Sequence, residues 1–223
     1  KHFLAIYNLC IYTFNNPILT NQNLCSLKNN IQEQLCQTDI YLIDQILKGR
    51  YNCTDKILDA GCGNGRNMNW FLQNGYDITG IDMNMEVINF LKDKYKTLPI
   101  GRFIVSTTDS TNFADDYFHH IISSAVLHFA NNSIHFNKMI AELARIVKPE
   151  GLLFIRMASN IGIEEKVIPV ADGVYLIPDG TKRFLLTRTL LADFMQQNKL
   201  VFIEPLKTVN VDDTRCMSTL VLQ

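Results

Sequence analysis

The sequence has 223 residues, of which 47% are hydrophobic and 19% charged. This is the composition of a folded globular protein, and it excludes collagen, coiled coils and low-complexity filaments. The length predicts one domain with a sizeable core. Lys and Arg number 21 and Asp and Glu 22, so the formal net charge of -1 provides no general attraction for a nucleic-acid backbone. No nucleic-acid partner is therefore expected.

The six cysteines are scattered, without a CxxC pair and without clustering with histidine. This spacing excludes a zinc ribbon or finger, and no metal is expected. Because a chain of this size can bury a core without disulfides, we expect reduced thiols and a cytoplasmic location. The apolar run at residues 3–14 is too short to span a membrane and is followed by no small-x-small cleavage site, so neither a membrane partner nor a secretion signal is expected.

The predicted elements begin after a polar stretch. Residues 1–32 are expected to form an N-terminal segment that ends in a connector rich in Asn and Gln, and residues 33–223 the main domain. Within that domain, apolar residues spaced three and four apart over 40–47 predict a helix that stops near Gly49.

From residue 56 onwards the pattern alternates between strand and helix. Three helices are predicted: one that contains Phe71, one that is capped by Asn84, and one that begins at about Ser133. A turn is predicted over residues 148–151. The strands are predicted at residues 56–59, 76–81, 103–105, 120–122 and 152–155. This alternation predicts a doubly wound α/β fold, with a mostly parallel sheet and helices on both faces.

The order changes near the C-terminal end. A helix over residues 190–197 precedes two strand-like runs, 200–203 and 217–222, which are expected to pair antiparallel because no helix fits between them. Residues 159–187 form an insertion before that helix. The Asp179-Gly180 turn predicts a hairpin within it. We expect the insertion to lie like a lid above the carboxyl edge of the sheet.

The most informative stretch is LDAGCGNGRN, residues 58–67. Its three glycines follow a strand and precede a helix, so the backbone can turn tightly and approach a ligand closely. A dinucleotide fingerprint requires a glycine where Arg66 stands, and a phosphate loop requires a lysine that this loop lacks, so pyrophosphate binding is disfavoured. Asp59, two positions before the first glycine, suits a cationic amino group instead.

Two further acidic residues follow neighbouring strands. Asp82 ends the second strand in GIDMN, where a carboxylate can accept both hydroxyls of a ribose. Asp109 follows the third strand in STTDSTNF and can accept the exocyclic amine of an adenine, with Ser110 or Asp115 as alternatives. Amine, ribose and adenine thus each have a candidate partner on one edge of the sheet.

This combination resembles the class I S-adenosylmethionine-dependent methyltransferases over residues 40–223. GCGNGRN followed by NGYD is similar in detail to the tellurite-resistance-type and other small-molecule members. The resemblance implies a Rossmann-like sheet of seven strands with an antiparallel C-terminal hairpin, S-adenosylmethionine as cofactor, and methyl transfer to a small acceptor by in-line displacement. It also places the methionyl part at the glycine loop, the ribose at Asp82 and the adenine amine at Asp109.

The resemblance also implies a site around the ends of the strands. His128, four residues after Ser124, is predicted as the general base, because a histidine with an unperturbed pKa near 6.5 accepts a proton at neutral pH. A strand-capping role is the alternative for His128, and a purely packing role for Cys62. The predicted cofactor-binding residues are Asp59, Gly61, Cys62, Gly63, Arg66, Asn67, Asp82, Met83, Asp109, Ser110 and Ser124.

Two other functions are compatible with the same pattern. An NAD-dependent oxidoreductase would share the fold and the acid at Asp82, although Arg66 disagrees with its glycine fingerprint. A non-catalytic protein that binds S-adenosylmethionine or S-adenosylhomocysteine would keep the loop without transferring a methyl group. A monomer or a homodimer is compatible with the sequence, and the acceptor is left open.

Overall fold

The computed structural model describes residues 32–35 and 37–223. The chain divides into two units, one up to Cys36 and one from Gln37 onwards, and the fold below is that of the second unit. The predicted N-terminal segment lies outside the described residues except for Gln32, with which a short helical stretch over residues 32–35 begins.

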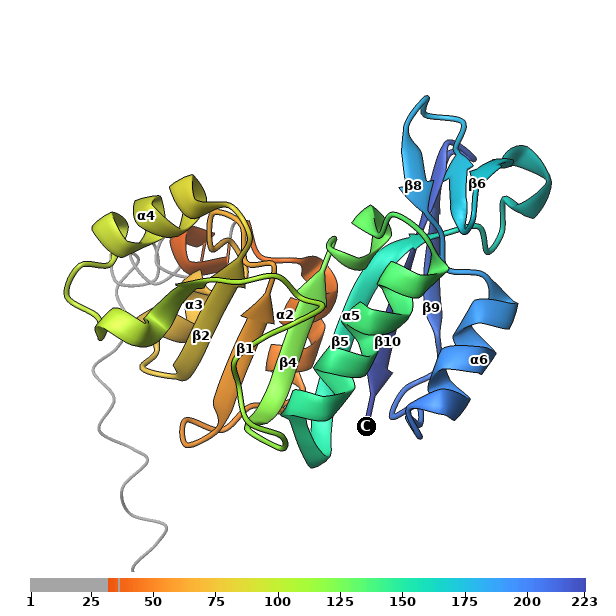
Figure 1. Cartoon of the computed structure of the whole chain (residues 1–223). Coiled ribbons are helices and arrows are strands. Elements are labelled where there is room, and N and C mark those ends of the chain that lie inside the picture. The colour runs from red at the N-terminus through yellow and green to blue at the C-terminus, as the bar shows by residue number, and fades with distance from the viewer. Residues whose placement is uncertain (1–31, 36) are drawn as a thin grey trace, which may run out of the picture. The chain divides into compact units, whose positions relative to one another are not determined.

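A seven-stranded sheet forms the centre of the unit (Figure 1). Its strands lie in the order β3-β2-β1-β4-β5-β10-β9, and the first five of these are parallel, whereas β10 runs antiparallel to both of its neighbours. Because the strand order reverses between β1 and β4, a crevice opens there at the carboxyl edge. The strands are β1 (Lys56–Ala60), β2 (Asp77–Asp82), β3 (Phe103–Val105), β4 (Phe118–Ser124), β5 (Val147–Ser159), β9 (Lys207–Val211) and β10 (Arg215–Leu222).

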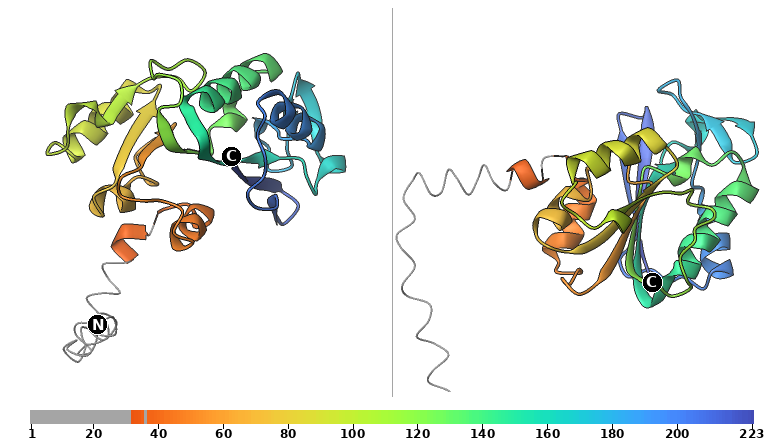
Figure 2. Two further views of the ribbon diagram at one scale, coloured as in Figure 1. Left: turned by 90° about the horizontal axis from the view of Figure 1, so that it is seen from below. Right: turned by 60° about the vertical axis from the view of Figure 1, so that its left-hand side comes forward.

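Helices cover both faces of this sheet (Figure 2). One buried cluster joins Leu42, Phe71 and Leu91 to the sheet, and the other joins Phe136 and Phe194 to its opposite face. The first cluster uses α2 (Ile40–Leu47), α3 (Asn69–Gln73) and α4 (Met85–Lys94), and the second uses α5 (Ser133–Ile146) and α6 (Arg188–Gln197). The predicted doubly wound α/β fold is therefore confirmed.

Two predictions for the second half of the unit were wrong in part. Residues 201–203 do lie antiparallel to residues 221–223, with a bridge between Phe202 and Leu222 and three backbone hydrogen bonds, but they form no strand of their own, and the longer ladder with β10 is that of β9. Pro205 lies between these two stretches and lacks the N–H that one continuous ladder would need. Residues 148–151 are not a separate turn but lie within β5, where Glu150 has a φ of +63°.

The insertion at residues 159–187 forms a second, three-stranded antiparallel sheet. Its strands are β6 (Ile168–Ala171), β7 (Val174–Leu176) and β8 (Lys182–Phe184). Asp179 and Gly180 lie in the turn between β7 and β8, as predicted. β8 packs against the short helix η2 (Leu127–Phe129), so the insertion lies beside the carboxyl end of β4 (Figure 1).

The described cysteines are free thiols: Cys53 is exposed, and Cys62 and Cys216 are buried. Within the described residues, no helix combines the length and the apolar character needed to cross a bilayer.

Candidate cofactor site

The glycine loop joins β1 to α3 in a conformation that only glycine adopts without strain. Gly61, Gly63 and Gly65 have φ values of +81°, +50° and +78°. The N–H groups of Gly61 and Cys62 both donate to the carbonyl oxygen of Ile81, at 2.8 Å each, and so fasten the loop to β2. A Cβ on Gly61 would lie 2.4 Å from Cγ2 of Val126. The loop therefore packs directly against the segment that follows β4.

Replacing Gly61 with alanine is expected to lower the free energy of unfolding by about 2–4 kcal/mol, because strain at positive φ adds to overpacking against Val126. Gly49→Ala is the matched control, since Gly49 has a φ of +67° but a Cβ added there would meet no atom within 4 Å. It should cost about 1 kcal/mol. Urea denaturation of the two variants measures both values, and equal losses would contradict the proposed clash.

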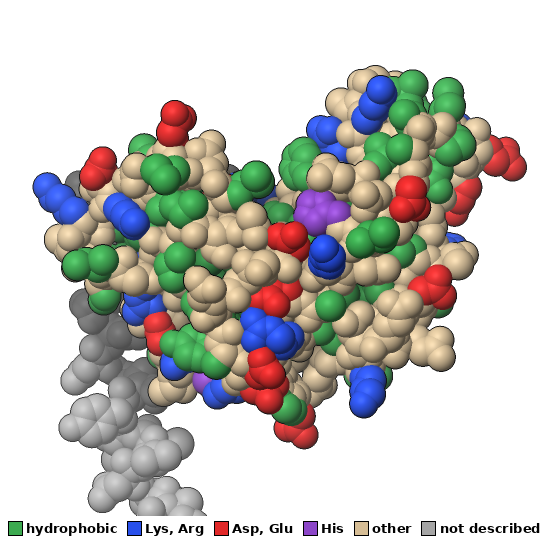
Figure 3. Space-filling model, in the orientation of Figure 1, with side chains coloured by type: hydrophobic (Ala, Val, Ile, Leu, Met, Phe, Trp, Pro, Cys, Tyr) green, Lys and Arg blue, Asp and Glu red, His purple; other side chains and the backbone are tan. Residues whose placement is uncertain are grey.

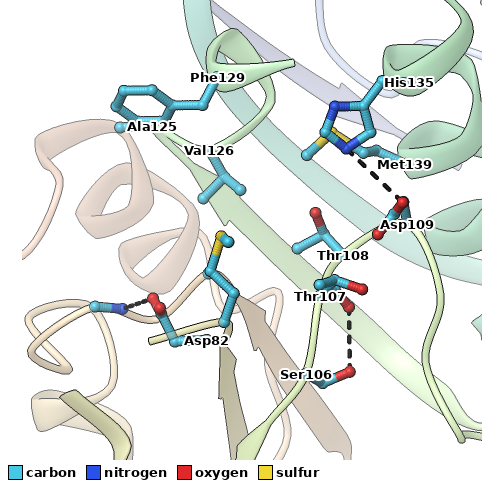
Figure 4. A pocket seen from close by; sticks show the side chains of 13 residues that line it. Asp82, Ser106, Thr107, Thr108, Asp109, Ala125, Val126, Phe129, His135 and Met139 are labelled. Atoms are coloured by element: carbon cyan, nitrogen blue, oxygen red, sulfur yellow. Dashed lines mark hydrogen bonds and ion pairs between the residues drawn. The ribbon is translucent and has the colours of Figure 1, made fainter. Parts of the chain in front are cut away.

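A cavity of about 530 Å³ opens at the carboxyl edge between this loop and α5 (Figure 4). Its volume is typical of a site for a small ligand. The space-filling view shows this face of the molecule hollowed between the α4 side and the three-stranded sheet (Figure 3). The cavity is lined by Gly61, Gly63, Asp82, Met83, Ser106, Thr107, Thr108, Asp109, Ala125, Val126, Phe129, His135 and Met139.

Asp82 lies at the end of β2 with its carboxylate held by two backbone groups. The N–H of Gly63 donates to Oδ2 at 3.0 Å, and the N–H of Asn84 donates to Oδ1 at 2.9 Å. Each carboxylate oxygen keeps a further lone pair. Asp82 therefore presents two oriented acceptors to the cavity, which suits a pair of vicinal hydroxyls.

Asp109 lines another part of the same cavity, and Thr107 and Thr108 lie between it and Asp82 in the view of Figure 4. Its Oδ2 lies 3.8 Å from Nε2 of His135. The N–H of Asn131 donates to Nδ1 of the same histidine at 3.2 Å, so in the neutral ring the proton is on Nε2 and faces Asp109. Acceptors on two carboxylates, together with the apolar side chains of Val126 and Met139 in the same cavity wall, suit a nucleoside.

The comparisons with known proteins agree with this geometry. Residues 58–155 match the family model described as "Methyltransferase domain". This region of the chain is therefore similar to a methyltransferase domain. A solved S-adenosylmethionine-dependent methyltransferase from Methanosarcina mazei has the same fold, with a TM-score of 0.66, 20% identity, and coverage of 80% of this chain and 96% of that one. The cofactor of this class is S-adenosylmethionine.

Two curated relatives match part of the chain in sequence. The methyltransferase-type protein YqeM of Bacillus subtilis is 26% identical over 111 residues, which are 49% of this chain and 45% of YqeM. A tRNA (carboxymethyluridine(34)-5-O)-methyltransferase of Arabidopsis thaliana is 32% identical over 99 residues, which are 44% of this chain and 23% of the plant enzyme. The chain thus spans less than half the length of either relative.

Asp59 lies beneath the glycine loop of the methyltransferase domain. Its side chain is buried, with 1% of the residue exposed, and Oδ2 has no hydrogen-bond partner among the described residues. Burial raises the pKa of Asp59 to about 7, while Arg66 opposes this shift and Asp82 reinforces it. An unpartnered buried acceptor costs free energy. A ligand ammonium group would satisfy it, so Asp59 fits the amino group of S-adenosylmethionine.

Arg66 and Ser124 belong to a polar network around Asp39, a buried residue that the sequence did not single out. Ser124 Oγ donates to Oδ2 of Asp39 at 2.9 Å, and Arg66 Nη2 donates to Ser124 Oγ at 3.2 Å. Arg156 Nη1 donates to the same Oδ2 at 3.1 Å, and Arg66 Nη2 lies 3.9 Å from it. Two guanidinium groups thus share one carboxylate. The remaining positive charge fits the carboxylate of the methionyl part.

Three other predicted residues lie away from the cavity wall. Cys62 is buried in the core cluster with Met68 and Ile78, and Asn67 accepts the N–H of Asp39 at 3.0 Å. Ser110 is absent from the wall, and its carbonyl oxygen accepts from Thr107 at 3.4 Å. The structure therefore gives Cys62 and Asn67 packing and bonding roles, whereas Gly61, Gly63, Asp82, Met83 and Asp109 line the cavity.

His128 lies in η2 and is buried. The N–H of Ala158 donates to its Nδ1 at 3.2 Å, so in the neutral ring Nε2 carries the proton and is a donor. Burial lowers the pKa of His128 to about 4, and the nearby Arg183 and Arg156 add to this shift. Such a ring is a poor proton acceptor at neutral pH. This geometry favours the strand-capping alternative over the general base, whose role stays a prediction.

The sequence did not single out several residues of the wall. Ser106, Thr107 and Thr108 directly follow β3, at the same edge as Asp109, and this position is the signal that would have found them. His135 and Met139 lie one helical turn apart on α5, which the sequence identified only as a helix that packs on the sheet. Ala125 follows β4 with a φ of +64°, a strained backbone of the kind found at functional sites.

Proposed function

We propose that this methyltransferase domain transfers a methyl group from S-adenosylmethionine to a small-molecule acceptor by in-line displacement. The observation that carries the proposal is the single cavity wall shared by the glycine loop, Asp82 and Asp109. Asp82 would hold the ribose hydroxyls and Asp109 the adenine amine. Asp59 would take the amino group and Arg66 the carboxylate of the methionyl part.

S-adenosylmethionine, when bound, supplies a methyl group already activated by its sulfonium. The residues of this chain then have to align the acceptor and exclude water, which can contribute about 7–11 kcal/mol for well-oriented groups. Val126 and Phe129 provide an apolar wall next to the glycine loop for both purposes. The step therefore requires few catalytic side chains.

Binding measurements test the proposal against its two alternatives. Calorimetric titration with S-adenosylhomocysteine should show binding, and titration with NAD should show none. Tight binding of NAD without binding of S-adenosylhomocysteine would support the oxidoreductase and contradict the proposal. Incubation of the protein and labelled S-adenosylmethionine with a metabolite extract should then yield a labelled small molecule. Failure to label anything would favour the non-catalytic binding protein.

A small acceptor is favoured over a tRNA. The net charge of -1 gives no overall attraction for a polyanion. The match to the plant tRNA enzyme covers only 23% of that enzyme. A match to so small a part of the plant enzyme does not assign its acceptor to this chain.

Substitutions of His128 test whether its ring caps the end of a strand or acts as a general base. His128→Asn keeps an acceptor for the N–H of Ala158, so at saturating cofactor we expect turnover within about threefold of the unmodified protein. His128→Ala leaves that buried N–H unpaired and should lower the free energy of unfolding by about 1–3 kcal/mol. Loss of turnover by 100-fold or more in His128→Asn, with unchanged stability, would show that the ring transfers a proton.

A further inference from the structure

The cavity has a cationic rim where η2 meets β8. Phe129 of η2 lines the cavity and is 61% exposed. The guanidinium of Arg183, on β8, lies over its ring with Cζ 5.1 Å from the centroid. Arg183 Nη1 also donates to the carbonyl oxygen of Lys182 at 2.8 Å. Neither contact neutralises the charge of Arg183.

The nearby carboxylates are already engaged by other groups. Asp39 is shared by Arg66 and Arg156. The charge of Arg183 helps to lower the pKa of Asp179. The Oδ1 atom of Asp179 accepts hydrogen bonds from both the N–H and the Oγ1–H of Thr181, at 2.9 and 2.7 Å. The positive field of Arg183 and Arg156 also reaches His128. Figure 3 shows Lys and Arg side chains over the three-stranded sheet beside the hollow. Among the described residues no ion pair joins Arg183 to a carboxylate, so its positive charge remains available at this rim.

We propose that the methyl acceptor is a small planar acid, negatively charged at neutral pH. Its anionic group pairs with the guanidinium of Arg183, and its apolar body lies against Phe129. This inference rests on the proposed function. A guanidinium binds a carboxylate through two parallel charge-assisted hydrogen bonds, and an exposed aromatic ring favours a flat apolar partner. A cationic acceptor would meet Arg183 and the sulfonium together, which disfavours amines that are protonated at neutral pH.

Binding of benzoate and benzamide to the protein saturated with S-adenosylhomocysteine tests the inference. The two probes have similar shapes and differ in charge. We expect benzoate to bind at least tenfold more tightly than benzamide. Arg183→Gln should abolish this preference, and Arg183→Lys should keep part of it because the charge remains. Lys182→Gln is the matched control, since Lys182 is exposed, adjacent on β8 and directed to the opposite face of the strand.

The outcomes separate this inference from the proposed function. If S-adenosylhomocysteine does not bind the unmodified protein, the proposed function fails and the inference fails with it. If S-adenosylhomocysteine binds but benzoate is not preferred, only the inference is overturned. An equal loss of the preference for benzoate in Lys182→Gln and Arg183→Gln would also overturn the inference. The preference would then arise from the general positive charge of β8 and not from a specific pair with Arg183. Melting temperatures of the variants verify that each one is folded.

Discussion

Replacing Asp82 with asparagine is expected to weaken the binding of S-adenosylhomocysteine by about 10- to 100-fold. The carboxylate would lose its charge-assisted bonds to the ribose hydroxyls, each worth about 1.5–3 kcal/mol, and one of its two acceptors would become a donor facing a backbone N–H. Where the amide NH2 group faces Gly63, the loop loses the hydrogen bond from the Gly63 N–H but keeps those from Gly61 and Cys62 to Ile81. Isothermal titration calorimetry measures the affinity.

Asp77→Asn provides the control for this measurement. Asp77 begins the same strand, undergoes the same chemical change and forms an ion pair with Arg102 far from the cavity wall. The affinity of Asp77→Asn should stay within about twofold of the unmodified value. An unchanged affinity in Asp82→Asn would refute the ribose assignment, and with it the orientation of the nucleoside in the cavity.

Replacing Asp59 with asparagine is expected to stabilise the free protein while weakening its affinity for the cofactor. The pKa of Asp59 is raised by burial from 3.8 to about 7, so the folded protein disfavours the ionised carboxylate. For an acid with a raised pKa, stability falls as the pH rises from about 4 to 7, because the unfolded chain loses the proton first. Asparagine removes this loss. The gain should be near zero at pH 4 and reach up to about 4 kcal/mol at pH 8.

Cofactor binding should show the opposite dependence at the same residue. Only the carboxylate form of Asp59 attracts a ligand ammonium, so the affinity of the unmodified protein for S-adenosylhomocysteine should fall as the pH drops below about 7. Titrations at pH 6 in buffers of different ionisation enthalpy should show proton release on binding. Asp59→Asn should bind weakly and without this proton release. Proton release that persists in Asp59→Asn would assign the titration to another group.

The sequence predicted the first half of the fold well because its signals are local. The strand before Gly61, the glycine loop and the Asn84 cap each depend on residues within a few positions of one another. The loop conformation needs glycine, and the cap needs a short polar side chain, so residue type and structure correspond directly. The placement of Asp82 at the same edge as the glycine loop followed from the shared direction of parallel strands.

The remaining features depend on contacts that are distant in the sequence. β9 forms the longer ladder with β10, whereas residues 200–203 contribute only a bridge at its end. This division depends on the position of Pro205 relative to residues 215–222. The environment of His128 depends on the N–H of Ala158, thirty residues later. The network around Asp39 joins α2 to the ends of β4 and β5. Hydrophobic periodicity carries no information on such pairings.

The place of β10 inside the sheet has a consequence for synthesis on the ribosome. β5 pairs with β4 on one side and with β10 on the other, and about 55 residues separate the end of β5 from the start of β10. At roughly 5–20 residues per second, the edge of β5 stays open for about 3–11 s during translation. An apolar strand edge left unpaired for this time can associate with other chains unless it is covered.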